Sequence, residues 1–314
     1  MPKAVVIKST GSWYILRTEN GDTYQARILG KFRLNGHKLT NPVAVGDEVD
    51  YVMEEDNKAM IQKIYPRKNY VVRQSPRKKH FLHLLAANID HAIVIVTIVE
   101  PMLKQGFIDR FLMMTEPHNI PVTIVFNKKD LYDEEALNIY EYLSSIYKSV
   151  GYETLLISAD TGENINKLRA VLDGKTTLMS GQSGVGKSTI INTLIGGDLL
   201  VTDELSYSSG KGQHTTTFAE MYTLEKGSYI IDTPGIKSLS FNNYEVMDIA
   251  HNFKELFRKS SECKYSDCTH RNEPKCAVKD ALETSEISEL RYYNYLALVE
   301  EAEDQNYWER LKDM

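Results

Sequence analysis

Two stretches of the sequence, VTIVFNKKD at 122–130 and TTLMSGQSGVGKS at 176–188, decide its fold class. Each begins as a short apolar run and ends in a polar loop, which is typical of a buried strand whose carboxyl end carries functional residues. The second stretch matches G-x-x-x-x-G-K-S and continues into STIINTLIG, which has a helical pattern. Strand, glycine-rich loop and helix in this order predict a phosphate-binding loop in an α/β domain.

The residues of this loop have distinct expected roles. The glycines let backbone N–H groups turn inward around a β-phosphate, and the positive end of the following helix adds to that field. Lys187 is expected to bridge the β and γ oxygens, and the Ser188 hydroxyl is expected to ligate Mg²⁺. The candidate phosphate-binding residues are Gly181, Gln182, Ser183, Gly184, Val185, Gly186, Lys187, Ser188 and Thr189.

The sequence NKKD at 127–130 is the candidate base-reading loop, because it ends an apolar run. The carboxylate of Asp130 can accept hydrogen bonds from the N1–H and the exocyclic amine of guanine, a pairing that adenine does not offer. The next apolar run, TLLIS at 154–158, ends where a backbone contact to the guanine oxygen is expected. The alternative of a P-loop ATPase or small-molecule kinase is therefore disfavoured. The candidate base-binding residues are Asn127, Lys128, Asp130, Ser158 and Ala159.

A third loop is expected to sense the γ-phosphate. It is DTPG at 232–235, in which Asp232 is placed to hold Mg²⁺ through water and Gly235 to offer its N–H to the γ-phosphate. The preceding segment GKGQHTTTF at 210–218 supplies threonines, one of which is expected to close on the magnesium when GTP is bound. The sequence leaves open which one it is; the candidates are Thr215, Thr216 and Thr217.

The base-reading loop precedes the phosphate loop, which reverses the order of a Ras-like GTPase. This order of the loops predicts a circularly permuted GTPase domain. Such a permutation is tolerated when the two termini of the domain lie close together at its surface. Near-continuous apolar strands alternate with helical segments from residue 91 onward. This pattern predicts a mostly parallel sheet covered by helices on both faces.

Residues 4–65 alternate short β-rich runs with turn signals and predict a small closed β-barrel. We favour an oligonucleotide-binding (OB) type barrel; the alternative is an SH3-like barrel, which periodicity does not exclude. The segment 63–80 holds many basic residues and no acidic one, and we interpret it as a linker that contacts RNA phosphates, with Tyr65 and Tyr70 available for stacking. The alternative is a solvated charge run. Its basic residues are Lys63, Arg67, Lys68, Arg73, Arg77, Lys78 and Lys79.

All three cysteines lie within fourteen residues, in CKYSDCTHRNEPKC at 263–276. Three thiolates and one imidazole form a complete tetrahedral set for one Zn²⁺, and because no ligand position stays open the site is expected to be structural. The alternative is a set of free cysteines and a surface histidine. The candidate ligands are Cys263, Cys268, His270 and Cys276.

The composition is that of a soluble globular protein. A formal net charge of -6 argues against a chain that coats nucleic acid with its whole surface, although it permits a local basic face. The sequence contains no apolar run long enough for a membrane span and no secretory signal at its start, so we expect a cytoplasmic protein, and nothing demands more than a monomer. The expected domains are residues 1–68, 69–239 and 240–314.

The permuted order, the barrel before it and the cysteine cluster after it closely resemble the RsgA (YjeQ/YloQ) family of small ribosomal subunit biogenesis GTPases. The resemblance covers essentially the whole chain. It implies an N-terminal OB-fold barrel, a central circularly permuted α/β P-loop GTPase domain and a C-terminal helical zinc-binding domain. It also implies GTP hydrolysis to GDP, stimulated by the small (30S) ribosomal subunit and its rRNA during late maturation.

The catalytic residue expected from this resemblance is His214. Ile236 follows DTPG, at the position where Ras-like enzymes place a glutamine that orients the attacking water. The family's switch-region histidine corresponds here to His214, which could orient or deprotonate water; its alternative role is structural or in RNA contact. A second functional hypothesis is a nucleotide-gated rRNA-binding module whose hydrolysis is incidental.

Overall fold

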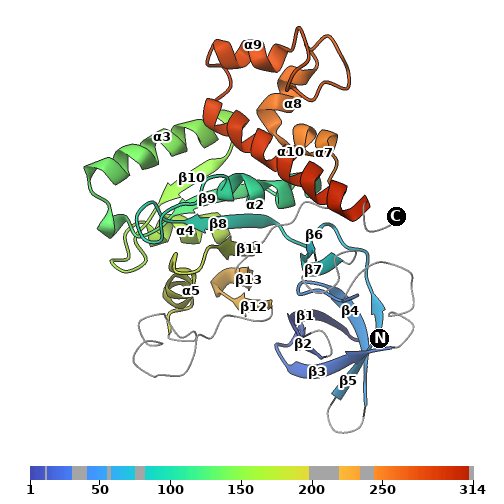
Figure 1. Ribbon diagram of the computed structural model, residues 1–314. Coiled ribbons are helices and arrows are strands. Elements are labelled where there is room, and N and C mark those ends of the chain that lie inside the picture. The colour runs from blue at the N-terminus through green and yellow to red at the C-terminus, as the bar shows by residue number, and fades with distance from the viewer. Residues whose placement is uncertain are drawn as a thin grey trace.

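The computed structural model describes residues 1–10, 13–29, 41–54, 58–74, 82–197, 219–233 and 244–310. Figure 1 shows three parts: an N-terminal barrel, a central sheet flanked by helices, and a group of C-terminal helices whose longest member, α10, crosses α2. None of the described helices is long and apolar enough to cross a membrane.

The barrel has the strand order β1-β2-β3-β5-β4 and is closed by pairing of β1 with β4. All of its pairings are antiparallel except β3 with β5, which is parallel. Alternate residues point inward, so that Val6, Leu16, Val49 and Ile61 form a common core. The expected OB-type barrel is confirmed. Its strands are β1 (Lys3–Ser9), β2 (Tyr14–Thr18), β3 (Thr23–Ile28), β4 (Glu48–Met53) and β5 (Lys58–Ile64).

The central sheet has the order β10-β9-β8-β11-β13-β12, and β12 alone is antiparallel to its neighbour in it. This confirms the expected mostly parallel sheet. The strands are β8 (His91–Val96), β9 (Val122–Phe126), β10 (Glu153–Leu156), β11 (Thr176–Gly181), β12 (Glu220–Thr223) and β13 (Tyr229–Asp232). The apolar runs at 91–99, 122–126, 218–224 and 228–232 contain β8, β9, β12 and β13 as predicted, whereas β10 begins one residue before its run (154–158) and β11 ends one residue after its run (176–180).

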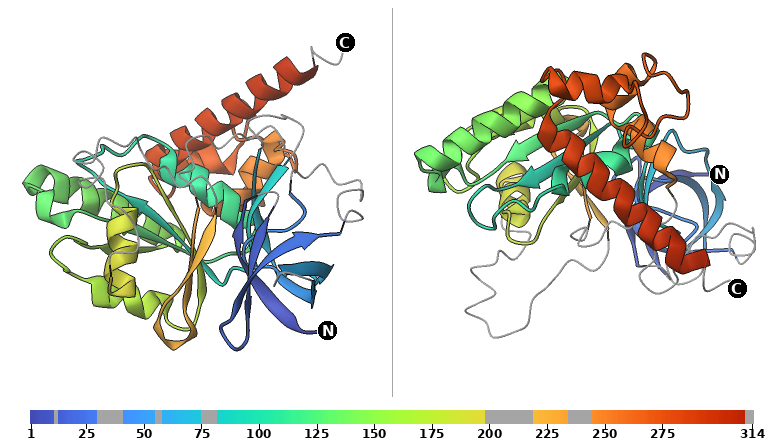
Figure 2. Two further views of the ribbon diagram at one scale, coloured as in Figure 1. Left: turned by 90° about the horizontal axis from the view of Figure 1, so that it is seen from below. Right: turned by 45° about the horizontal axis from the view of Figure 1, so that its top comes forward.

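Helices cover both faces of this sheet, as the left view of Figure 2 shows. In β8, Ala92, Val94 and Val96 face one core with α2 and α3, whereas Ile93 and Ile95 face a second core with α4 and α5. Burial of both faces explains why the strand is apolar throughout rather than alternating. The helices are α2 (Phe107–Thr115), α3 (Glu134–Val150), α4 (Ile165–Leu172) and α5 (Lys187–Ile195).

The barrel and the central sheet are joined by a pairing that the sequence did not indicate. β1 pairs antiparallel with β12 at Lys8 and Glu220, so that one sheet runs through both parts. The two side chains form an ion pair, with 2.8 Å between Lys8 Nζ and Glu220 Oε2. From the next barrel strand, the Arg17 guanidinium lies over the ring of Tyr229 at 4.4 Å.

The basic segment 63–80, which we interpreted as a linker, is partly sheet. β6 (Tyr70–Gln74) and β7 (Leu82–Ala87) form an antiparallel hairpin of their own. Arg67 contacts the fully buried carboxylate of Asp47, with 2.7 Å between Nε and Oδ1. Because a buried carboxylate needs a charged partner, Arg67 has a structural role.

The C-terminal helices pack against the central part through one continuous apolar core. A buried ionic cluster lies within this contact: Arg291 of α10 bonds to Asp109 of α2 and makes two bonds to Glu255 of α8, at 2.7 and 2.9 Å. Only 1% of the Arg291 side chain is exposed. The expected boundary at residue 239 lies outside the described residues. The helices are α7 (Val246–Asn252), α8 (Lys254–Ser260), α9 (Ala277–Glu283) and α10 (Glu289–Arg310).

Candidate nucleotide site and metal centre

The loops expected to bind the nucleotide gather at one edge of the central sheet. β8, β9, β10, β11 and β13 run parallel, so their carboxyl ends meet there. β9 leads into Asn127, β10 is followed by Ser158 and Ala159, β11 ends at Gly181, and β13 ends at Asp232. Ligands of open α/β sheets bind in the crevice outside this edge.

Asn127 connects three of these loops. Its side-chain amide nitrogen donates to the carbonyl oxygen of Val185 at 2.9 Å, and its side-chain oxygen accepts from the backbone N–H of Ala159 at 3.0 Å. The residue is 2% exposed. A Cβ atom at Gly186 would lie 2.4 Å from the Asn127 amide nitrogen, so the close approach of the two loops requires glycine there.

The Asp130 carboxylate is oriented from the neighbouring loop. The Ser158 hydroxyl donates to Asp130 Oδ1, and the same hydroxyl accepts from the backbone N–H of Thr161 at 3.1 Å. Lys128 has a left-handed backbone conformation with φ of 62° and precedes the short 3-10 helix η3 (Lys129–Leu131). The structure therefore brings the first and second base-binding loops into direct contact.

The phosphate loop is bounded by close backbone contacts. A Cβ atom at Gly181 would lie 2.4 Å from the carbonyl oxygen of Ile95, which only glycine avoids. The Lys187 amine donates to the carbonyl oxygens of Gly181 and Gln182, at 3.0 and 2.9 Å, and so lies along the loop. Gln182, Ser183, Gly184 and Val185 form the loop between β11 and α5, and Ser188 and Thr189 lie in the first turn of α5.

The first turn of α5 is arranged as an anion site. Its N-cap residue, Gly186, has φ of 90° and provides no side-chain hydrogen bond to the turn. The N–H groups at the start of a helix have no partners within the helix, so they can donate to phosphate oxygens.

Asp232 has the properties of a residue that holds a cation. It is 4% exposed, and its Oδ1 has no hydrogen-bond partner among the described residues. Burial raises the pKa of Asp232 to about 6, the Lys187 charge opposes this shift, and the Glu220 charge adds to it. A buried carboxylate without a partner is unfavourable, and a divalent cation nearby would compensate for it. The position therefore fits Mg²⁺.

Several expected residues cannot be placed. Those that lie outside the described part of the chain are His214, Thr215, Thr216, Thr217 and Gly235.

The four candidate zinc ligands come together. Their ligand atoms all lie within 4.8 Å of one another. His270 Nδ1 is 3.7 Å from the Cys263 sulfur and 3.5 Å from the Cys276 sulfur. Burial raises the pKa of Cys268 to about 12, and it lowers the pKa of His270. Buried neighbouring thiolates need a cation, and a neutral imidazole is the form that ligates metals, so this donor set fits one Zn²⁺.

The metal loop is held by partners that the sequence analysis did not identify. Glu273 accepts from the N–H and hydroxyl of Thr269, at 2.7 and 2.6 Å, and from the N–H groups of Arg271 and Asn272, at 2.8 and 3.0 Å. Burial alone would raise the pKa of Glu273, but these bonds lower it to about 2. The hydroxyl of Tyr292 donates to the carbonyl oxygen of His270 at 2.7 Å. One signal for this partner was available in the sequence, because Glu273 is an acidic residue between the candidate ligands His270 and Cys276.

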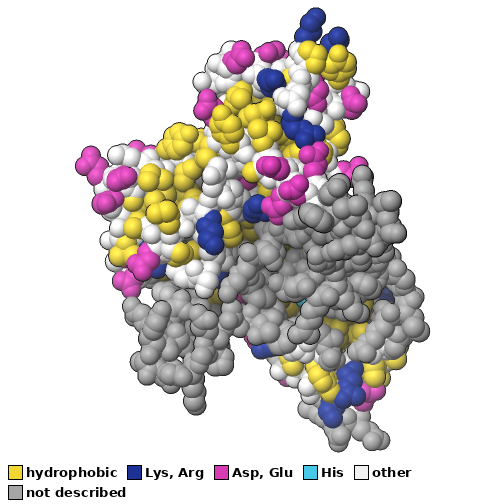
Figure 3. Space-filling model, in the orientation of Figure 1, with side chains coloured by type: hydrophobic (Ala, Val, Ile, Leu, Met, Phe, Trp, Pro, Cys, Tyr) yellow, Lys and Arg dark blue, Asp and Glu magenta, His cyan; other side chains and the backbone are white. Residues whose placement is uncertain are grey.

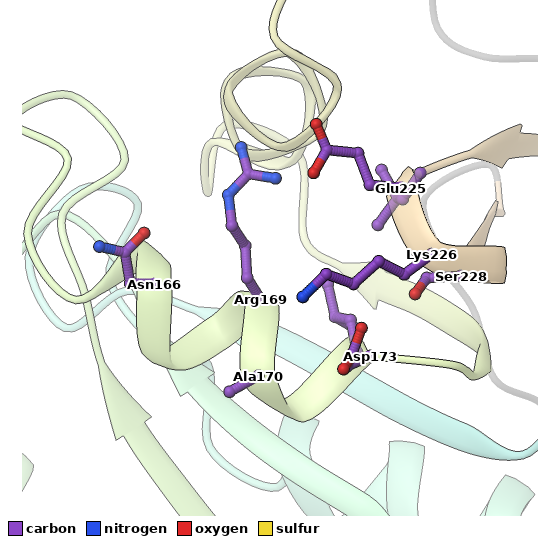
Figure 4. Close-up of a pocket in the computed structure, with 9 residues that line it drawn as sticks. Asn166, Arg169, Ala170, Asp173, Glu225, Lys226 and Ser228 are labelled. Atoms are coloured by element: carbon purple, nitrogen blue, oxygen red, sulfur yellow. The ribbon is translucent and has the colours of Figure 1, made fainter.

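A cavity of about 270 Å³ lies away from both sites, between α4 and the turn that joins β12 to β13 (Figure 4). Arg169, Asp173 and Lys226 are among the residues that line it. The Arg169 guanidinium donates to the carbonyl oxygens of Thr193 and Leu194, at 2.7 and 2.8 Å, and so caps the end of α5. Because this turn precedes β13, the cavity lies at the edge opposite to Asp232 and is not part of the nucleotide site.

Comparisons with known proteins cover nearly the whole chain. A family model described as RsgA GTPase matches residues 64–242, and a model described as RsgA N-terminal domain matches residues 3–61. A Bacteroides fragilis protein named small ribosomal subunit biogenesis GTPase RsgA is 47% identical over 97% of this chain and 98% of its own length. A protein of the same name from Flavobacterium psychrophilum is 44% identical over 96% of this chain and 94% of its own length.

Two solved structures are similar in fold. The structure of YjeQ from Thermotoga maritima has a TM-score of 0.76 and 33% identity, covering 96% of this chain and 98% of that one. The structure of YloQ, described as a circularly permuted GTPase, has a TM-score of 0.72 and 28% identity, covering 97% and 96% of the two chains.

Proposed function

This chain belongs to the RsgA GTPase family, and from that membership we propose that it hydrolyses GTP while bound to the small (30S) ribosomal subunit, as a factor in that subunit's late maturation. The observation that carries the nucleotide assignment is the double contact of Asn127, which joins the base-reading loop to the phosphate loop and to the second base loop. One nucleotide can therefore be held by its base and its phosphates at once.

Asp130 is the residue that selects guanine. Its carboxylate accepts from the N1–H and the exocyclic amine of the base, and the Ser158 hydroxyl keeps it in position. A site built to pair with these donors rejects adenine strongly, because adenine lacks the N1–H and the exocyclic 2-amine with which the carboxylate pairs.

Lys187, Ser188 and Asp232 are the residues that hold the triphosphate and its magnesium. Lys187 exchanges its bonds to the carbonyl oxygens of Gly181 and Gln182 for bonds to the β and γ oxygens. Ser188 and Asp232 would hold Mg²⁺, Ser188 through its hydroxyl and Asp232 through its carboxylate. Bound Mg²⁺ would supply positive charge where negative charge develops during phosphoryl transfer.

The segments nearest to the γ-phosphate complete the site in this proposal. Gly235 donates its N–H to the γ-phosphate, and one of Thr215, Thr216 and Thr217 ligates the magnesium. His214 orients the attacking water when the subunit is bound. The support for these roles is the sequence and the family resemblance alone.

The cysteine cluster holds one structural Zn²⁺ through Cys263, Cys268, His270 and Cys276. Support comes from the closeness of the four ligand atoms and from the burial of Cys268, His270 and Cys276. With four protein ligands no position stays open for a substrate, so the metal fixes the loop between α8 and α9 rather than taking part in hydrolysis.

The barrel contacts rRNA. Its five-stranded topology is that of proteins that bind oligonucleotides. Arg67 pairs with Asp47, and the Tyr70 and His118 rings pack at a tilt of 51° with 4.6 Å between their centroids, so these side chains serve the fold. The phosphate contacts of the basic segment are assigned from the sequence to Arg77, Lys78 and Lys79, which lie outside the described residues. The ribosomal partner implies a cytoplasmic location, and a monomeric state stays a prediction.

Steady-state GTP hydrolysis by the zinc-loaded protein tests this function, measured alone and with purified small subunits, large subunits or assembled ribosomes. We expect strong stimulation by small subunits alone. Hydrolysis that no ribosomal particle stimulates, with GTP still bound, would instead indicate a nucleotide-gated RNA-binding module and would remove the role assigned to His214.

A further inference from the structure

The barrel holds strand β12 of the central sheet with two basic side chains. On the face shown in Figure 3, Lys and Arg side chains lie beside hydrophobic side chains over the described part of the barrel. Lys8 of β1 pairs with Glu220 of β12, with 2.8 Å between Nζ and Oε2. Arg17 of β2 donates to the Thr223 hydroxyl, and its Nη2 lies 3.8 Å from the Met221 sulfur. Because alternate residues of a strand point to opposite faces, the barrel contacts β12 from both faces.

Glu220 lies between the barrel and the candidate magnesium residue. In the sheet, Lys8 is directly opposite Glu220 across β1 and β12, and Glu220 is directly opposite Asp232 across β12 and β13. Side chains of directly opposed residues lie on the same face, with their Cβ atoms about 4.5–5.5 Å apart. The three side chains therefore form a row that runs from the barrel to Asp232.

This row lies on the face of the sheet that the phosphate loop covers. Tyr222 and Ile230, each two residues from a member of the row, pack in the core with α4 and α5. α5 begins at Lys187, the last lysine of the phosphate loop. Burial is the main cause of the raised pKa of Asp232, the Lys187 charge opposes it and the Glu220 charge adds to it. The Glu220 carboxylate is therefore close enough to act on Asp232.

The charge that Glu220 presents to this site depends on Lys8. The two side chains are 37% and 32% exposed, and an ion pair as exposed as this one contributes little to stability. A divalent ion nevertheless interacts twice as strongly as a monovalent ion with each nearby charge. Paired with Lys8, Glu220 is close to neutral at a distance, whereas an unpaired Glu220 adds a negative charge beside Asp232.

We propose that Lys8 of the barrel is a positioning residue of the magnesium site, which sets the Mg²⁺ affinity by pairing with the Glu220 carboxylate beside Asp232. This inference rests on the proposed function, in which Asp232 holds Mg²⁺, and adds to it a route from the barrel to that site. Lys8 reaches Glu220 through the pairing of β1 with β12, so the barrel contributes to the nucleotide site a charge that the central domain alone lacks.

Release of a fluorescent, non-hydrolysable GTP analogue from the full-length, zinc-loaded protein tests this route. The release rate is measured over a series of free Mg²⁺ concentrations at about pH 8, above the Asp232 pKa of about 6, because release is slower when Mg²⁺ is bound with the nucleotide. Lys8→Met is expected to lower the Mg²⁺ concentration for half-maximal slowing by about 3- to 10-fold, and Glu220→Gln to raise it by a similar factor. A merely structural role of the pair would shift both variants in the same direction.

Two further variants complete the measurement. Lys8→Met combined with Glu220→Gln removes both charges and should return the Mg²⁺ dependence to within about 2-fold of the parental value. Lys254→Met is the matched control, because Lys254 is 35% exposed and its ion pair of 3.0 Å with Glu116 also joins two parts of the chain. This pair lies at the other edge of the sheet, before β9, so its loss should leave the Mg²⁺ dependence unchanged. Circular dichroism melting verifies that each variant folds.

Two results would overturn the proposal. An unchanged Mg²⁺ dependence in folded Lys8→Met and Glu220→Gln variants, or a shift of the same sign in both, contradicts the route from the barrel and leaves the proposed function in place. Release that does not respond to Mg²⁺ in the parental protein contradicts the role of Asp232 as well. Subunit-stimulated GTP hydrolysis measured in parallel shows whether the GTPase assignment still stands.

Discussion

The side-chain amide of Asn127 donates to the carbonyl oxygen of Val185, 2.9 Å away, and so fastens the base-reading loop to the phosphate loop. The two residues are 58 positions apart in the chain. In the permuted order the base-reading loop comes first, yet this contact restores the arrangement in which one nucleotide spans both loops.

Replacement of Asn127 by alanine is therefore expected to weaken GTP and GDP binding together. The change leaves the carbonyl oxygen of Val185 and the N–H of Ala159 without their partners in a buried place, which costs about 1–3 kcal/mol and corresponds to about 5- to 150-fold in affinity. Titration calorimetry with each nucleotide measures this. Asn166→Ala, at an exposed position on α4, is the control; equal affinities of the two variants would contradict the bridging role.

Removal of one zinc ligand is expected to unfold the C-terminal metal loop. Cys268→Ser should lower the bound zinc from one per chain to near zero and lower the melting temperature, because metal binding and folding of such loops are coupled. Metal analysis of protein purified without chelator, together with thermal melting, measures both effects. Ser266→Ala changes an exposed residue of the same loop and should keep the zinc. A parental protein without zinc would contradict the assignment.

Arg291 is expected to matter more for stability than a comparable surface arginine. Arg291→Met leaves Asp109 and Glu255 buried without their cation, which costs about 3–5 kcal/mol. Arg271→Met breaks a more exposed pair with Glu303, which contributes at most about 1 kcal/mol. Urea unfolding of both variants measures the difference. Equal destabilisation would show that the buried cluster is not what holds α10 to α2.

His91 is expected to make the central domain less stable in acid. It is 8% exposed and bonds to Thr123 at 2.9 Å; burial, with a smaller effect of Lys175, lowers the pKa of His91 to about 4. The unfolded chain, in which the histidine pKa is about 6.5, binds the proton more tightly. The contribution of neutral His91 to the free energy of unfolding is therefore fully present above about pH 6.5 and is lost as the pH falls toward 4.

The loss from this residue between about pH 7 and pH 5 is on the order of 2 kcal/mol. Denaturant unfolding at a series of pH values measures it, and His91→Gln should reduce the slope over this range. His251→Gln, at an exposed position, should keep the parental slope. A slope that is the same in the parental protein and both variants would assign the acid sensitivity to other groups.

Much of the fold could be predicted because its signals are local. Short β-rich runs between turn signals marked the barrel strands, and the apolar runs that end at Phe126, Ser180 and Asp232 marked the strands that carry the nucleotide loops. The metal cluster could likewise be predicted from the cysteine spacing, because all four ligands lie in one short segment.

The features that sequence reasoning missed depend on contacts between distant segments. The pairing of Lys8 with Glu220 joins residues 212 positions apart and leaves no local pattern. Arg291 lies in a helix rich in charged residues, so the sequence alone does not distinguish it from an exposed arginine. Its burial depends on the carboxylates of Asp109 and Glu255, which lie on two other helices. The hairpin of β6 and β7 was hidden because basic residues in the segment were interpreted as a solvated or RNA-binding linker.

Small subunits are expected to stimulate GTP hydrolysis at a site in which Asp130 recognises the base. Replacement by asparagine exchanges an acceptor for a donor, so the site should pair with the 2-carbonyl of xanthine instead of the 2-amine of guanine. The most direct test is subunit-stimulated hydrolysis of GTP and of xanthosine triphosphate by the parental protein and by Asp130→Asn. We expect stimulated hydrolysis to move from GTP to xanthosine triphosphate in the variant, whereas stimulated GTP hydrolysis at the parental rate by Asp130→Asn would show that Asp130 does not select the base.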